Sequence, residues 1–178
     1  MYQVKIKIVG ISPLRMNNFL EAKQTTGTSR KLSKEERIQD AYDRAYKDKD
    51  DKYCVQKKAI KACIVNGGKR VKIGRASASA SLRAIFHLDK ENIILPKISK
   101  AEIVSEVVRI PPKTGPRVIQ YFVLFKEWNL EFTATLVDDR FPENAIRDSV
   151  IEAGMYYGLL DGRPDYGRFV LESFEKIK

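Results

Sequence analysis

Alternating apolar and charged residues at the start of the chain restrict the possible folds more than any other feature. Val4, Ile6 and Ile8 alternate with two lysines, which is the period-two pattern of a strand with one buried and one solvated face. We therefore expect a half-buried strand over residues 2–9. The chain thus begins with an element that belongs to a sheet with one buried face.

Two helices are expected after this strand. Ser33 and Glu36 have the spacing of a capping box, and apolar residues recur at helical spacing after them. This pattern predicts a helix over residues 34–47. A second helix is predicted over residues 55–66, because its apolar and lysine residues fall on opposite faces, and Gly67 is expected to cap it.

The second half of the chain is predicted to contain mostly strands. Runs rich in β-branched and aromatic residues predict strands over residues 103–110, 117–125 and 130–137. The middle one is expected to be a buried central strand. Another helix is expected to open at Asp139 or Pro142. A glycine-rich loop, residues 158–168, then leads to a last strand over residues 169–174.

This order of elements permits the arrangement β-α-β-β-α-β, in which an antiparallel sheet carries helices on one face. The expected fold class is therefore α+β, with a ferredoxin-like sheet of the kind that RNA-recognition domains share. A chain of 178 residues, 43% of them apolar, can bury one core. We expect a single domain over residues 1–178, with a ferredoxin-like core and a basic helical insertion at about residues 20–100.

Nearly all of the net charge lies in one segment. The chain has 33 Lys and Arg residues against 23 Asp and Glu, a net charge of +10, yet no acidic residue stands between Asp51 and Asp89. A solvated face normally mixes both signs, because like charges oppose a helix, so this basic segment predicts an anion-binding surface. Its candidate phosphate ligands are Lys57, Lys58, Lys61, Lys69, Arg70, Lys72 and Arg75, and Tyr53 beside them is a candidate for stacking on bases.

Small residues and glycines interrupt the basic segment at Gly67, Gly68 and Gly74 and over residues 77–81. They would let the backbone approach phosphates or bases closely, although a plain flexible loop explains them equally well. Residues 23–34 lack apolar periodicity and predict a mobile loop. We expect this loop to become ordered only when nucleic acid binds.

Two pieces of the chain resemble the RAMP superfamily of CRISPR RNA-binding proteins. Residues 4–18, a strand followed by Ser-Pro-Leu, resemble its first strand and turn, and residues 158–174 resemble its C-terminal glycine-rich loop and last strand. The run Gly-Arg-Pro-Asp-Tyr-Gly-Arg-Phe also resembles uncharacterised phage and archaeal-virus proteins of this size. The resemblance implies a ferredoxin-like core that holds RNA, most similar to the backbone subunits that coat a guide RNA. Its partners would be CRISPR-like effector subunits or further copies along the strand.

The resemblance also implies roles in the glycine-rich loop, where Gly158, Gly162 and Gly167 would be loop glycines and Arg163 and Arg168 would bind phosphate. The residues themselves support this, because glycines expose backbone N–H groups and arginine forks onto phosphate oxygens. The alternative is that these glycines only cap a helix and make a turn. Neither this loop nor the glycine pair of the basic segment has P-loop spacing, so nucleotide hydrolysis is not supported.

Several protein classes are excluded by scarce residue types. Cys54 and Cys63 are the only cysteines and His87 is the only histidine, so neither a zinc site nor a histidine-based nucleophilic triad is expected. We expect no catalytic residue, metal or cofactor. The lack of a secretory leader and of a membrane-spanning apolar run predicts a cytoplasmic protein without a membrane partner, or one in the infected host's cytoplasm if it is viral.

The sequence therefore favours a non-enzymatic protein that binds single-stranded RNA or DNA, and it leaves the choice between the two open. Two alternatives also stay open. One is a metal-independent RNA-processing endoribonuclease, which needs a positioned base such as His87 or a tyrosine. The other is a viral structural or inhibitory protein that docks an acidic or nucleic-acid-binding partner.

Overall fold

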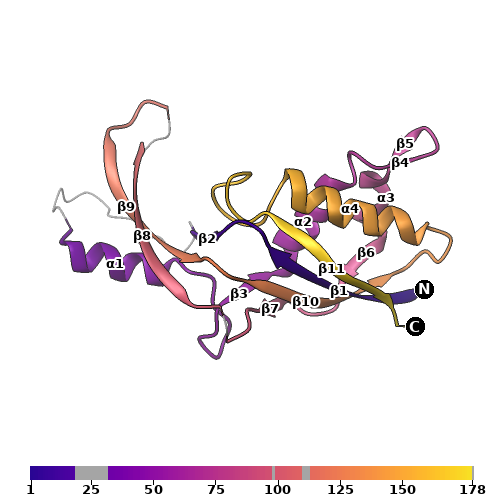
Figure 1. The fold of residues 1–178 in the computed structure, drawn as a ribbon, viewed down its shortest axis with the longest axis horizontal. Helices are drawn as coiled ribbons and strands as arrows, with labels where there is room; N and C mark the ends of the chain where they lie inside the picture. The colour runs from indigo at the N-terminus through magenta and orange to yellow at the C-terminus, as the bar shows by residue number, and fades with distance from the viewer. Residues whose placement is uncertain (19–31, 98, 110–112, 178) are drawn as a thin grey trace.

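The centre of the fold is a four-stranded antiparallel sheet (Figure 1). The computed structural model describes residues 1–18, 32–97, 99–109 and 113–177. The strands of this sheet are β1 (Tyr2–Gly10), β6 (Phe86–Leu88), β10 (Asn129–Leu136) and β11 (Phe169–Lys176), in the order β11-β1-β10-β6. In chain order these are the fourth, first, third and second core strands, which is the ferredoxin-like order. The α+β, ferredoxin-like fold expected from the sequence is confirmed.

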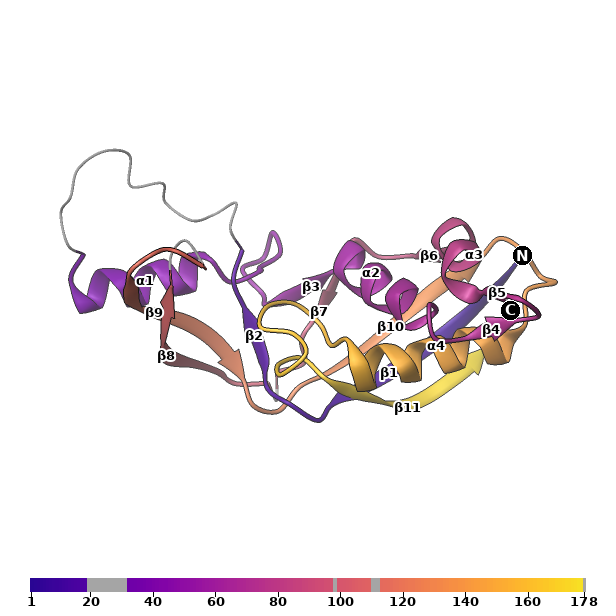
Figure 2. The same ribbon diagram turned by 90° about the horizontal axis from the view of Figure 1, so that it is seen from above.

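The alternation in β1 places the core on one side of the sheet. Val4, Ile6 and Ile8 are buried, whereas Lys5 and Lys7 lie on the opposite face. The helices α2 (Lys57–Gly67), α3 (Ala78–Ile85) and α4 (Glu143–Tyr156) cover the buried face. Figures 1 and 2 show these helices together on one side of the sheet, which leaves the other side uncovered.

The basic helix α2 is an element of the core itself, because it connects β1 to β6 in the β-α-β-β-α-β order. It begins two residues later than expected, since residues 54–56 form strand β3 (Cys54–Gln56), which pairs with β7 (Asn92–Ile94). The expected cap, Gly67, is instead the last helical residue, and Gly68 takes the cap position. A Cβ at Gly67 would overlap the carbonyl oxygen of Ser149 on α4. Glycine is therefore needed for the close approach of the two helices.

The residues after α2 form a hairpin and a helix, and not the plain flexible loop that was one of the two expectations for this stretch. Strands β4 (Lys72–Ile73) and β5 (Ala76–Ser77) pair across Gly74, whose φ is +60°. Residues 78–81 then form the first turn of α3, because Ala78 and Ser79 are buried against the core. The hairpin projects beyond the helices (Figure 1).

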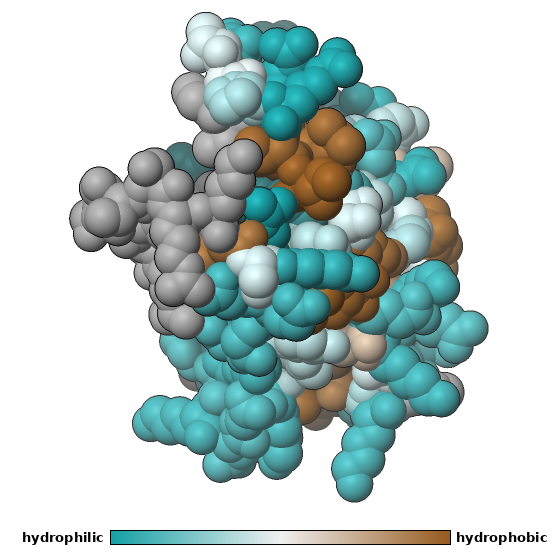
Figure 3. Space-filling model, turned by 90° about the vertical axis from the view of Figure 1, so that its left-hand side faces the viewer, coloured by the Kyte–Doolittle hydropathy of each residue, from teal (hydrophilic) through white to brown (hydrophobic). Residues whose placement is uncertain are grey.

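A second, smaller sheet lies at the other end of the molecule. It consists of β2 (Leu14–Met16), β9 (Arg117–Phe125) and β8 (Ala101–Arg109), in the order β2-β9-β8. The strand β9 is central in this sheet as expected, but only its C-terminal half is buried. Val107 and Ile119, opposite each other on β8 and β9, are exposed. Figure 3 shows this end of the molecule, with apolar atoms below its polar tip.

Helix α1 (Lys34–Asp43) packs against β9. The capping box of Ser33 and Glu36 is confirmed. The helix ends four residues earlier than expected because Arg44 turns into the structure and is buried. Its guanidinium donates to Asn17 Oδ1 at 2.6 Å and to the Tyr121 carbonyl at 3.3 Å. Most of the expected mobile loop lies in residues 19–31, outside the described residues.

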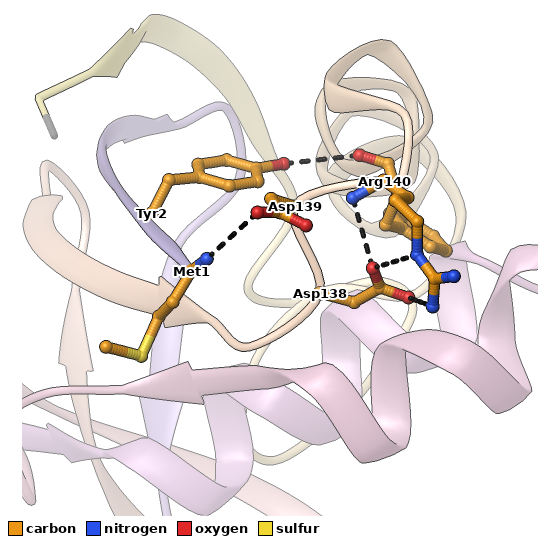
Figure 4. A network of polar contacts seen from close by, with 6 residues as sticks. Met1, Tyr2, Asp138, Asp139 and Arg140 are labelled. Carbon is orange, nitrogen blue, oxygen red and sulfur yellow. Dashed lines mark hydrogen bonds and ion pairs between the residues drawn. The ribbon is translucent and has the colours of Figure 1, made fainter.

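A polar network holds the connection between β10 and α4 against β1 (Figure 4). The N-terminal ammonium lies 3.5 Å from Asp139, and the Tyr2 hydroxyl donates to the Phe141 carbonyl at 3.4 Å. Arg140 pairs with Asp138 at 3.1 Å. These contacts help to set the start of α4. Within the described ranges, no helix combines the length and apolar character needed to span a membrane.

Replacing Gly67 with alanine tests the contact between α2 and α4. Helix propensity alone would make this change stabilising by about 1 kcal/mol. We expect a loss of about 1–3 kcal/mol instead, because the new methyl group must displace the α4 backbone. Urea unfolding of Gly67→Ala measures the sign, and a stabilised variant would contradict the close approach.

Candidate nucleic-acid interface

The open face of the core sheet does not suit base stacking. RNA-recognition domains stack bases on aromatic residues of their sheet, but the outward positions of β1 and β10 carry no aromatic residue. Its lysines are also neutralised: Lys5 lies 2.9 Å from Glu131, and Lys7 lies 2.7 Å from Glu172. A nucleic-acid site is therefore better sought on the helical side.

Three adjoining hollows lie on the helical side, and residues of α2 line two of them. The first, about 480 Å³, lies at the glycine-rich loop and is bordered by Tyr156 and Arg163. The second, about 260 Å³, shares Leu160 with the first, and the third, about 350 Å³, shares Lys58 with the second. We call the first the loop hollow and the three together the α2 groove. Segments that are about 100 residues apart in the sequence meet in it.

The α2 groove is positively charged. Lys58, Lys61, Arg83 and Arg163 line it, and none of the four forms an ion pair with another described residue. Burial lowers the pKa of Lys61, so an approaching anion would favour its charged form. The groove thus offers four cations whose charges remain available to a ligand.

The direction of these lysines follows from the packing of α2. Ile60, Cys63 and Ile64 are buried against the core, which turns Lys58 and Lys61 outward, as the sequence pattern predicts. Lys57, which was also predicted on this helix, differs because it already has an acidic partner: its ammonium lies 2.5 Å from Glu91.

The remaining predicted cations of the basic segment gather at the other end of α2. Lys69, Lys72 and Arg75 are exposed on and beside the β4–β5 hairpin. Arg70 differs from them, because its Nε donates to Glu152 at 2.6 Å and its guanidinium lies 3.9 Å from the centre of the Tyr156 ring. The predicted ligands therefore lie at the two ends of α2, and Arg70 and Lys57 have partners within the protein.

The glycine-rich loop is packed against the protein's own backbone. Gly158, Gly162 and Gly167 all have positive φ, between +72° and +75°. A Cβ at Gly167 would overlap the Leu159 carbonyl, and one at Gly162 would collide with Arg15 and Tyr166. For Gly162 and Gly167, the two glycines predicted to bind nucleic acid, this crowding favours the alternative that they only make a turn.

The two pieces of the chain that carry the RAMP resemblance lie side by side. The backbone N–H of Gly167 donates to the Pro13 carbonyl at 2.8 Å, and that of Ile11 donates to the Arg168 carbonyl at 2.8 Å. Of the two arginines predicted in the loop, Arg163 borders the loop hollow. Arg168 is exposed but is not among the residues that border the α2 groove.

Arg15 on β2 fixes this loop to the second sheet, and no pattern in the sequence singles it out. Its Nε lies 2.8 Å from Asp161, and its guanidinium also pairs with Glu106 on β8. The Tyr166 hydroxyl donates to Glu106 at 2.5 Å, and this hydrogen bond raises the pKa of Tyr166. The two acidic partners of Arg15, Asp161 and Glu106, lie far from it in the sequence, so only the folded chain brings these three residues together.

The other singled-out residues have structural surroundings. Tyr53 is half-buried, with its ring 5.1 Å from that of Phe125 in an edge contact. His87 is exposed, with Nε2 2.9 Å from the Ala84 carbonyl. Burial raises the pKa of Cys54 to about 11 and that of Cys63 to about 12. Across the part of the chain that the structure describes, no three His, Cys, Asp or Glu residues form a metal-binding group.

Comparison with known proteins gives a structural neighbour but no sequence relative. No protein-family model and no curated protein matches the chain. Its structure is similar to a chain in the cryo-EM structure of the type III-B Cmr-beta bound to cognate target RNA, with a TM-score of 0.60 and 13% identity. The match covers 99% of this chain and 61% of that one, so this chain spans about three-fifths of the neighbour's length. The likeness shows a shared fold.

Glu106→Gln tests the network around Arg15. We expect it to lower the free energy of unfolding by about 1–3 kcal/mol, because Arg15 and Tyr166 both lose a charged acceptor. The matched control is Glu102→Gln on the same strand, whose exposed pair with Lys126 spans 2.7 Å and should contribute less than about 1 kcal/mol. Urea unfolding compares the two, and equal losses would contradict the role of the network.

Proposed function

We propose that this protein is a non-enzymatic binder of single-stranded nucleic acid of the RAMP type, and that its ligand is RNA. The strand's phosphates would follow the α2 groove past Lys58, Lys61 and Arg163, with the β4–β5 hairpin extending the basic track. The observation that carries the proposal is the contrast between the two faces. The groove holds cations without acidic partners, whereas the lysines of the open sheet face are paired.

The shape of the groove supports a single strand over a duplex. Hollows of about 260–480 Å³ separated by side chains suit splayed, unstacked bases, which are the features that proteins read in single-stranded RNA. Cations along the path supply affinity without sequence preference. The glycine-rich loop positions Arg163, and its glycines allow the packing that this requires.

RNA as the ligand and RAMP membership are supported by two independent likenesses. The sequence resembles the RAMP superfamily at residues 4–18 and 158–174, and the fold resembles that of a chain from a structure that contains target RNA. We accordingly propose CRISPR-like effector subunits or further copies of this chain as partners. The β8–β9 hairpin is the candidate contact, because Val107 and Ile119 are exposed there. Two like charges, Arg109 and Arg117, also face each other beside them, an arrangement that destabilises an isolated hairpin.

The proposed function predicts which cations set the salt dependence of binding. For single strands, the slope of log K against log salt is about −0.7 per phosphate contact. Replacing Lys58, Lys61 and Arg163 by glutamine should therefore flatten the slope by about 2 and weaken binding. Titrations of labelled single-stranded RNA, single-stranded DNA and duplex at several salt concentrations measure this, and we expect the single-stranded RNA to bind most tightly.

A charge-matched control separates local contacts from net charge. Replacing Lys5, Lys7 and Lys126 by glutamine removes the same formal charge from residues that are already paired with glutamates. This variant should keep the wild-type slope. Equal slopes in the two triple variants would refute the placement along α2, and no binding of any strand by the wild-type protein would refute the function.

A further inference from the structure

Tyr156 is an exposed aromatic residue at the C-terminal end of α4, next to the proposed path of the strand. Its side chain is 48% exposed, and it borders the loop hollow. The sequence pattern gave no reason to select it. An exposed tyrosine ring beside a cationic groove offers a flat surface on which a base can stack, at little cost in conformational entropy.

One face of this ring is already occupied by a fixed cation. The guanidinium of Arg70 lies 3.9 Å from the ring centre, and Glu152 holds it by a hydrogen bond of 2.6 Å. Arg70 is not among the residues that border the loop hollow, whereas Tyr156 is. Tyr156 therefore contacts both the guanidinium and the hollow.

The loop hollow has the size and chemistry of a nucleotide site. At about 480 Å³ it lies within the range of small-ligand pockets. Leu160 and Tyr157 supply apolar and aromatic wall, and Arg163 supplies a cation with no acidic partner among the described residues. Asp161, the acidic residue that borders the hollow, forms an ion pair with Arg15 at 2.8 Å. A base with an attached phosphate matches this combination of flat, apolar and cationic groups.

We propose that the loop hollow binds one unstacked base of the strand, stacked on Tyr156, with the adjoining phosphate on Arg163. Arg70 and Glu152 hold the ring in place. This inference rests on the proposed function and adds a base-binding site to it. Because every base has an aromatic face, the site accepts any sequence, but it requires a base that is free of pairing.

The test is a double-mutant cycle that combines a substitution in the protein with the removal of bases from the RNA. Binding of a short single-stranded RNA is measured by fluorescence anisotropy for wild type, Tyr156→Ala and Tyr156→Phe. The measurements are repeated with an RNA of the same length in which every nucleotide is abasic. The matched control is Met155→Ala, because Met155 is 50% exposed on the same helix but lines the hollow between α4 and β11.

We expect Tyr156→Ala to weaken binding about 5-fold to 100-fold, as the loss of one stacked base does, with an unchanged salt slope. Tyr156→Phe, which keeps the ring, and Met155→Ala should stay within about 2-fold of wild type. With the abasic RNA, wild type and Tyr156→Ala should bind equally. Circular dichroism and thermal melting confirm that each variant is folded.

Two results overturn the inference while leaving the proposed function intact. One is wild-type affinity in Tyr156→Ala. The other is a loss of affinity in Tyr156→Ala that is as large with the abasic RNA as with the intact RNA, which would mean that the ring contacts no base. A wild-type protein that binds no strand would overturn the inference and the function together.

Discussion

The close approach of α2 to α4 is the constraint on which the rest of the structure depends. Gly67 lies against the α4 backbone, and Gly154 of α4 lies against the backbone of β11. The two helices and the sheet are therefore stacked with almost no space for side chains at these points. The apolar face of α2 is used up in this packing, so its lysine face must point outward. The loop that follows α4 is brought beside the same face, and Leu160 of this loop lines one hollow together with Lys58.

A second interaction joins this core to the other end of the molecule. Arg15 contacts acidic residues of β8 and of the glycine-rich loop at once, and lies over the rings of Phe122 and Tyr166. Because the guanidinium is mostly buried, its pairs are better held than ion pairs on the surface. The loop hollow consequently has a fixed wall on the side of the second sheet, which is a requirement for a preorganised binding site.

Local patterns predicted most of the elements, whereas the contacts that define the site came only from the fold. Period-two alternation placed β1, a run rich in β-branched and aromatic residues placed β10, and the capping box placed the start of α1, because these signals depend on neighbours in the sequence. The sequence patterns misplace the end of α1, which the burial of Arg44 determines. They also misplace the start of α2, which the pairing of β3 with β7 determines. Tyr156 gave no signal for the same reason: its importance depends on Arg70, which lies 86 positions earlier in the chain. The predicted cations could be identified by charge, but only the structure indicates which of them already have acidic partners.

Photocrosslinking of single-stranded RNA that contains 4-thiouridine, followed by mass spectrometry of the crosslinked peptides, tests the central claim most directly. The claim is that the strand lies on the helical side of the sheet and not on its open face. We predict crosslinks in α2 and in the segment from Tyr156 to Arg163, and none in the outward-facing residues of β1 and β10. Crosslinks confined to β1 and β10 would contradict this account.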